Sequence, residues 1–337
     1  MVKNKIGFFI ILFTILLVVS GIVASGIGVV SIPFIDVVKI ILSQFGLTDV
    51  SNLPENFVLT VLQLRLPRIL MTILAGASLA ICGAVFQSVF RNPICDPYIL
   101  GISSGASLGA AIAFIIGLDV ILFGITLPAL ITALITLFVI LGIAGLAHRN
   151  SVQTLLLTGI AVNFLISAVI TLLIVMNKQE MQKIIFWTMG SFASVSYKEI
   201  LLFVPIFCIS IISLFYYSKD LNIMQLGSET ARTLGVNSSR VTIITLFISS
   251  FLIAAVVAIC GVVGFIGLIV PHIVRLIWGN NNRTLFIFSL FLGALFLLIA
   301  DTLARTLATN SELPVGSITA IAGAPYFIYL LLKKRSA

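Results

Sequence analysis

Few residues of this 337-residue chain are ionisable, and two groups of them have a spacing that could support function. Arg65-Leu66-Pro67-Arg68 places two cations beside a proline, and Asp301 and Arg305 stand four residues apart. Side chains four residues apart share one face of a helix, so Asp301 and Arg305 can form an ion pair. These residues could therefore bind an acidic partner or an anionic solute, or the pair could simply neutralise itself within the fold.

The sequence lacks the residue sets of the common catalytic sites. Its two histidines and four cysteines form no CxxC pair and no Cys/His cluster, so we expect no metal site, no disulfide and no cofactor. There is no GxxxxGK[ST] phosphate loop for ATP. Asp301 is the only acid well inside an apolar segment, whereas proton- or sodium-coupled carriers usually need several. We therefore expect neither an enzyme nor an ion-coupled carrier, although a secondary carrier remains the alternative.

The segments that carry these residues are long and apolar. Because 60% of the residues are hydrophobic and 9% are charged, the chain has too little polar surface for a water-soluble fold. A membrane-spanning helix needs about 20 mostly apolar residues. The stretches that qualify are 7–30, 61–85, 97–117, 121–147, 152–176, 199–217, 240–260, 262–278, 284–307 and 314–332. Open sheets cannot span lipid, so the sequence predicts an all-α integral membrane protein, one domain over residues 1–337 with about ten transmembrane helices in the bilayer.

The ends of the chain are predicted to lie in the cytoplasm. The first apolar segment is too long for a cleaved signal and has no convincing cleavage site before Pro33, so we interpret it as a helix. With ten helices both termini share one side, and this choice leaves more Lys and Arg inside than outside. The net charge of +8 comes from basic residues scattered over short loops, so we expect no nucleic-acid partner.

With this orientation, Arg65 and Arg68 lie at the outer end of the second helix, with Pro67 in its first turn. The two arginines could extend to lipid headgroups. The preferred interpretation is a cationic patch that binds an acidic protein or solute, because Lys and Arg are usually concentrated on the cytoplasmic side and are less expected outside. Arg305 is near the outer end of the ninth helix and would join this patch if it reaches solvent.

Two further patterns have an ordinary and a functional explanation. Ala80-Ile81-Cys82-Gly83 recurs as Ala258-Ile259-Cys260-Gly261, and a proline follows each glycine after ten residues, at Pro93 and Pro271. This is either a chance match or a trace of the inverted repeats found in transporters. Pro271 should also kink its helix, and the adjacent His272 is expected to make a structural hydrogen bond.

Small and hydroxylated residues concentrate at Gly76-Ala77-Ser78 and over residues 101–109, which include Ser103 and Ser104. Close packing of helices explains them, and lining of a weakly polar pathway is the alternative.

The longest polar stretch assigned to the cytoplasm runs from residue 219 to residue 240. Ser228 can cap a short helix there, Glu229 suits the positive end of that helix, and Gly235 can terminate it. The alternative is a solvated loop that merely joins two membrane helices. A short helix would in addition offer a partner subunit a place to bind.

Together these motifs resemble the FecCD-type permeases, the membrane subunits of ABC importers for iron siderophores, haem and cobalamin. The resemblance follows the chain in order beyond residue 60, and includes Phe90-Arg91-Asn92-Pro93 and Gly264-Phe265-Ile266-Gly267. The residues that carry it are 64–68, 83, 90–93, 96–97, 100–106, 187–191, 234–236, 264–275, 300–301, 304–305, 312–316 and 323–325.

The resemblance implies the partners of the chain. Two permease subunits, identical or related, would enclose a path across the cytoplasmic membrane of a bacterium or archaeon. Two ATP-binding cassette ATPase subunits would lie beneath them, and an extracytoplasmic binding protein would deliver the cargo. That cargo would be an iron-siderophore complex, or haem or cobalamin.

The resemblance also implies roles for individual residues, none of them catalytic. Arg65, Arg68 and Arg305 would dock the binding protein. The inner gate would lie at the turn 149–154, with Asn150 and Ser151. The residues expected to couple to the ATPase are Leu226, Gly227, Ser228, Glu229, Ala231, Arg232, Leu234 and Gly235.

Overall fold

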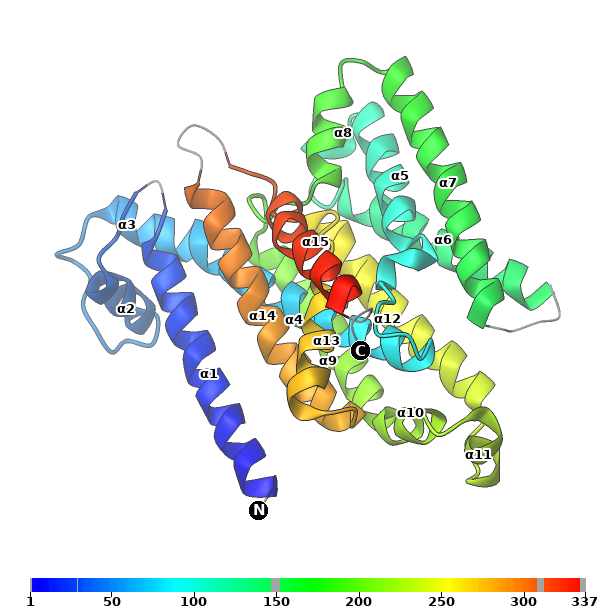
Figure 1. The fold of residues 1–337 in the computed structure, drawn as a ribbon. Helices are drawn as coiled ribbons and strands as arrows, with labels where there is room; N and C mark the ends of the chain where they lie inside the picture. Colours follow the sequence, from blue (N-terminus) through cyan, green and yellow to red (C-terminus); the bar gives the residue numbers. More distant parts are fainter. Residues whose placement is uncertain (1, 29, 147–151, 308–311, 334–337) are drawn as a thin grey trace.

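The computed structural model describes residues 2–28, 30–146, 152–307 and 312–333, and within these ranges it is built of helices without a strand (Figure 1). Seven helices are long and apolar enough to span a membrane, and three shorter apolar helices account for the other predicted segments. The all-α membrane fold is therefore confirmed. The helices are α1 Val2–Gly26, α4 Leu66–Val89, α5 Ile102–Ile115, α6 Thr126–Leu146, α7 Val152–Met176, α9 Tyr197–Tyr216, α12 Ser238–Cys260, α13 Ile266–Trp278, α14 Asn282–Thr306 and α15 Val315–Lys333.

The remaining elements are short. They are α2 Phe34–Ser43, α3 Glu55–Leu59, α8 Met181–Thr188, α10 Ser218–Met224 and α11 Ser228–Thr233, with 3-10 turns η2 Pro97–Leu100 and η3 Leu118–Val120. Helices α3 and α8 lie at one end of the bundle, whereas α10, α11 and the N-terminus lie at the other (Figure 1). We refer to these as the α8 end and the α11 end.

The second membrane helix starts earlier than predicted. It runs without a break from Glu55 to Val89 and includes a π-helical turn, η1 Thr60–Arg65. Pro67 lies in the first turn of α4 as predicted, but the helix continues on its N-terminal side, so this turn is not the start of the membrane segment. In a π-helical turn each N–H donates to the carbonyl five residues earlier. Pro67 has no N–H, so the carbonyl of Leu62 receives no hydrogen bond from it. That carbonyl instead accepts a hydrogen bond from the hydroxyl of Tyr197, the first residue of α9, at 2.6 Å.

Helix α4 is the centre of the bundle and contacts α14, α13, α12 and α9. Two pairs of glycines allow this close packing. A Cβ on Gly76 would lie 2.3 Å from the carbonyl oxygen of Gly293 in α14, and a Cβ on Gly83 would lie 1.8 Å from that of Gly267 in α13. Small residues let helix backbones touch in this way. Close packing therefore accounts for Gly76 within its run of small residues.

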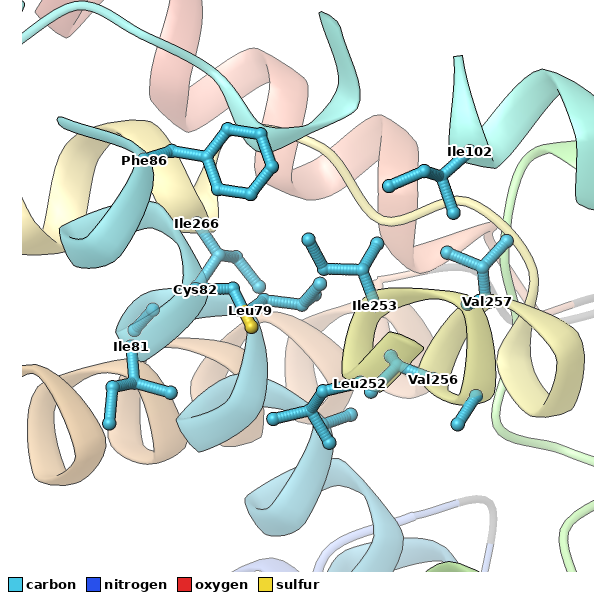
Figure 2. Packing of buried hydrophobic residues seen from close by; sticks show 14 of the residues in the cluster. Leu79, Ile81, Cys82, Phe86, Ile102, Leu252, Ile253, Val256, Val257 and Ile266 are labelled. Carbon is cyan, nitrogen blue, oxygen red and sulfur yellow. The ribbon is translucent and has the colours of Figure 1, made fainter. Parts of the chain in front are cut away.

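Large apolar side chains fill the space around α4. Figure 2 shows Leu79 and Phe86 of α4 with Ile253 of α12, Ile266 of α13 and Ile102 of α5. Each of the five is at most 1% exposed. Protein therefore surrounds most of α4.

Irregular backbone between α12 and α13 shortens the predicted segment 262–278, because α13 begins only after residues 261–265. Other parts of the chain satisfy the polar groups of this interruption. The N–H of Ser191 donates to the carbonyl of Cys260 at 2.8 Å, and the hydroxyl of Tyr98 donates to that of Val263 at 3.0 Å. Non-helical backbone at membrane depth is stable only when it is buried and paired in this manner.

The two copies of the Ala-Ile-Cys-Gly sequence have different structures. Helix α4 continues through Gly83, whereas Gly261 follows the end of α12 with a φ of 71°. Pro93 lies in the connection after α4, whereas Pro271 lies inside α13. The sequence match therefore does not mark a repeated structural unit.

We expect Gly83→Ala to lower thermal stability, because the added methyl group meets the backbone of Gly267, which cannot swing aside as a side chain can. Overpacking of this kind costs about 1–3 kcal/mol. Gly142→Ala in α6 is the matched control, since its Cβ would meet nothing within 4 Å. Thermal unfolding of the purified variants in detergent measures both effects. Equal stability of the two variants would show that the contact between α4 and α13 relaxes easily.

Candidate functional site

The three arginines of the predicted outer patch come together at the α8 end. Arg65 ends η1, Arg68 lies in the first turn of α4, and Arg305 lies in the last turn of α14. Their exposed fractions are 7%, 6% and 7%. The sequence placed all three on one surface, but the structure buries them in one ionic cluster. Their role in docking stays a prediction.

Asp301 lies at the centre of this cluster and is fully buried. Its carboxylate accepts hydrogen bonds from Nε and Nη2 of Arg68 at 3.0 and 2.8 Å, and its Oδ2 lies 3.6 Å from Nε of Arg305. Arg68 also binds the half-exposed Glu312 through Nη1 at 2.8 Å. The predicted pair of Asp301 and Arg305 is confirmed. The closer partner, Arg68, was not predicted because it is 233 positions away.

The other two arginines bind carbonyl groups at the end of α1. Arg65 donates to the carbonyls of Ser25 and Val30, the first at 2.6 Å, and Arg305 donates to that of Ala24 at 2.8 Å. The last turn of a helix leaves carbonyls without partners, and cations are favourable there. The cluster therefore fixes the end of α1 against α4 and α14.

We expect Asp301→Asn to destabilise the protein strongly, because Arg68 and Arg305 would lose their shared buried counter-charge. Breaking a buried ion pair from one side costs about 3–5 kcal/mol. Glu312→Gln is the comparison, and it should cost less because that side chain is half exposed. Thermal unfolding decides between them, and an equal loss would mean that Glu312 is as important to the cluster as Asp301.

Small residues of α5 pack against α6. A Cβ on Gly105 would lie 2.4 Å from Oγ1 of Thr136. Ser104 is buried, and its hydroxyl donates to the carbonyl of Gly101 at 2.8 Å, while Ser103 is half-buried. Packing accounts for these contacts, and a pathway role of Ser103 and Ser104 stays a prediction.

Helix α7 carries a polar stripe that the sequence analysis missed. Asn163, Ser167 and Thr171 are spaced by four residues, so they share one face, and all three are exposed. Polar groups on a membrane helix usually face water or protein instead of lipid. The spacing of four within an apolar segment was a signal that could have identified them. The predicted gate residues Asn150 and Ser151 precede this helix and lie outside the described residues.

The predicted polar segment forms two short helices, α10 and α11 (Figure 1). Gly227 is the N-cap of α11 and has a φ of 121°, so the prediction of a Ser228 cap is wrong by one residue. The positive φ of Gly227 makes the turn into the helix, and Ser228 is already helical. Gly235, with a φ of 82°, follows α11 as predicted, and the N–H of Val236 donates to the carbonyl of Ala231 at 2.8 Å.

The surface of α11 combines charged and apolar side chains. Glu229 and Arg232 are exposed, whereas Ala231 is buried. Leu226 and Leu234, on either side of the helix, are 68% and 58% exposed. Large exposed apolar side chains beside charged ones are typical of a surface that contacts another protein.

A second ionic group at the α8 end joins α8 to the turn after α5. Nζ of Lys183 lies 2.9 Å from Asp119 and 3.0 Å from Glu180. The hydrogen bond from Lys183 lowers the pKa of Asp119, and the hydrogen bonds to Asp119 and Glu180 raise the pKa of Lys183.

We expect this group to stabilise α8 equally over a wide pH range. The stability that Asp119 contributes is present above its unfolded pKa and is lost only as the pH falls through its lowered folded pKa. The stability that Lys183 contributes is lost only as the pH rises through its raised folded pKa. Hydrogen exchange of α8 amides, corrected for intrinsic rates, should therefore stay constant from about pH 5 to 9. Lys183→Gln should speed this exchange, and Lys178→Gln should not. An exchange rate that changes steeply near neutral pH would contradict this account.

Comparison with known proteins places these features in context. The model of the FecCD transport family matches residues 15–333. The ABC transporter permease protein YvrB of Bacillus subtilis is 38% identical over 337 residues, which cover 98% of this chain and 95% of that protein. The cobalamin import system permease protein BtuC of Halobacterium salinarum is 41% identical over 288 residues, covering 86% of this chain and 76% of that protein. Other relatives are named as permeases for hemin, Fe(3+)-citrate and molybdate.

A solved structure has the same fold. It is described as an inward-facing conformation of a metal-chelate type ABC transporter, and it aligns with a TM-score of 0.84 at 31% identity. The alignment covers 97% of this chain and 99% of that one.

Proposed function

The chain belongs to the FecCD transport family of ABC importer permeases, and from this premise we propose that it carries a bulky metal chelate across the cytoplasmic membrane. The main support is the family match over residues 15–333, which includes the second half of α1 and all the other membrane helices. The cargo we propose is an iron-siderophore complex, or haem or cobalamin. Relatives named for cobalamin, hemin and Fe(3+)-citrate support a chelate, and the relative named for molybdate marks the range of the family.

Uptake of labelled ferric siderophore, haem and cobalamin tests the cargo directly. Cells that lack the chain should lose uptake of one of the three, and the wild-type gene should restore it. Unchanged uptake of all three in a strain without a redundant system would contradict the proposed cargo.

We place the α11 end and both termini in the cytoplasm and the α8 end outside. This orientation follows from the excess of Lys and Arg on the cytoplasmic side, and the N-terminus and α11 lie at the same end (Figure 1). One of the two ATPase subunits would then contact α11, an extracytoplasmic binding protein would contact the α8 end, and a second permease subunit would complete the path.

The arginine cluster supports docking at the α8 end through its net charge. Arg65, Arg68 and Arg305 outnumber the carboxylates Asp301 and Glu312 within it. Because the guanidinium groups are buried, they would not touch a binding protein directly. They would act through their positive electrostatic potential and by holding Glu312 and the end of α1 in position. Acidic lobes on the binding protein would complement this field.

We expect Arg65→Gln to weaken binding of the cognate binding protein several-fold and to reduce the salt dependence of that binding, because one positive charge is lost. Arg65→Lys keeps the charge and should retain most of the affinity. Surface plasmon resonance at two salt concentrations measures both, with thermal unfolding as the check on folding. An unchanged affinity for Arg65→Gln would leave the cluster with a structural role alone.

We expect Leu226→Asp and Leu234→Asp to abolish copurification of the ATPase. Each change would place a charge in the apolar contact with the ATPase, from which water is excluded. Leu47→Asp is the matched control, since Leu47 is equally exposed, at 70%, in the connection between α2 and α3. If no ATPase copurifies even with the wild type, the alternative of a secondary carrier is favoured.

We propose that the polar stripe of α7 faces the path. In a Cys208→Ser background, a cysteine at position 163, 167 or 171 should react with a water-soluble maleimide. A cysteine at Leu165 or Leu172, which are exposed apolar residues of the same helix, should not react. Labelling of the second set alone would show that the stripe does not line the path.

A further inference from the structure

A pocket of about 310 Å³ at the α11 end has a lining unlike the rest of this apolar chain. We call it the arginine pocket. It is lined by Gln87, Ser88, Arg91, Pro93, Gln225, Arg275 and Asn280. Every lining residue except proline is polar, two are arginines, and none is acidic.

Each of the two arginines is held in place by hydrogen bonds from one nitrogen of its guanidinium group, Nη2. Nη2 of Arg275 donates to the hydroxyl of Ser88 at 2.7 Å and approaches the carbonyl of Ala84 at 3.4 Å. Nη2 of Arg91, whose backbone φ is 48°, donates to the carbonyl of Met224 at 2.5 Å. The other guanidinium nitrogens have no acceptor among the described residues. Both side chains are therefore positioned and still have N–H groups to donate.

Neither arginine has a counter-charge within 4.0 Å among the residues that the structure describes. Across the described ranges, the ion pairs within 4.0 Å involve other cations, including Arg68 and Arg305 at the opposite end. Arg275 is only half exposed, so its charge is partly removed from water. An unpaired charge in such a site is costly, and an anion would offset that cost.

The inner wall of the pocket has further polar atoms without partners. Gln87 is 2% exposed, and its Nε2 donates to the carbonyl of Leu268 at 3.0 Å, while its Oε1 has no partner among the described residues. Asn282 is fully buried and accepts a hydrogen bond from Ser88, and within the described ranges neither its Nδ2 nor Nε of Arg275 has a partner. Buried polar groups are normally paired, so this wall is suited to a polar occupant.

The geometry points to a carboxylate side chain of the ATPase subunit as the occupant of the arginine pocket, an inference that rests on the proposed function. Planar guanidinium groups bind carboxylates with two parallel hydrogen bonds. Three of its lining residues, Pro93, Gln225 and Asn280, lie in connections between helices at the α11 end. Gln225 directly precedes Leu226, so a partner seated on α11 would also cover the pocket.

Binding of the purified cognate ATPase to the permease in phosphatidylcholine nanodiscs tests this inference. We expect Arg275→Gln and Arg91→Gln each to weaken binding at least tenfold, and Arg275→Lys to recover part of it. Arg283→Gln is the matched control, because it removes one positive charge in the first turn of α14 without altering the pocket lining. Thermal unfolding of each permease variant alone shows whether it is folded.

Each outcome decides one question. Wild-type affinity in both folded glutamine variants would overturn the inference and leave the proposed function intact. Failure of the wild-type permease to bind any ATPase would overturn both. If phosphatidylglycerol raises the thermal stability of the wild type but not of Arg275→Gln, with ATPase affinity unchanged, the bound anion is a lipid phosphate and the inference is wrong. Restoration of Arg275→Glu by an acid-to-lysine change in the ATPase would identify the partner carboxylate.

Discussion

The close contact of α4 with α13 and α14 determines how the other elements are arranged. Gly76 and Gly83 bring the backbone of α4 against Gly293 and Gly267, where a single methyl group would not fit. Within a bilayer, helices associate through close packing because lipid tails are as apolar as the side chains that they contact. With α4 held in this way, α12 and α9 pack on its other faces, and most of the central helix is buried in protein.

This central position explains why the two ends of α4 carry arginines of different kinds. At one end, Arg68 is paired with Asp301 and Glu312, and the neighbouring arginines satisfy the last carbonyls of α1. That cluster has its own counter-charges and holds three helices together. At the other end, Arg91 and Arg275 have no counter-charge in the described part of the chain, so their charge is available to a partner. The same residue type is structural in one place and suited to recognition in the other.

The interruptions of the helices are consistent with transport. The N–H of Ser191 is paired with the carbonyl of Cys260 at the end of α12, and the carbonyl of Val263 is paired with the hydroxyl of Tyr98, so these stretches avoid the cost of bare backbone in lipid. Short helices joined by such stretches can shift relative to one another with fewer broken hydrogen bonds than continuous helices require. The polar stripe of α7 lies on the outside of this single chain, where a second subunit would turn it into the wall of an enclosed path.

The sequence by itself determined the membrane class, the ten apolar segments, the pairing of Asp301 with Arg305 and the end of α11 at Gly235, because each depends on composition or on residues within a few positions. The family followed from motifs in linear order. Only the tertiary structure revealed the burial of Arg65 and Arg68, the bidentate bond from Arg68 to Asp301 and the pocket around Arg275. These depend on which helices are neighbours, and that is decided by glycine contacts between segments far apart in the chain. Local patterns also misplaced the start of the second helix, because a π-turn and a hydroxyl from α9 together accommodate a proline that would otherwise end it.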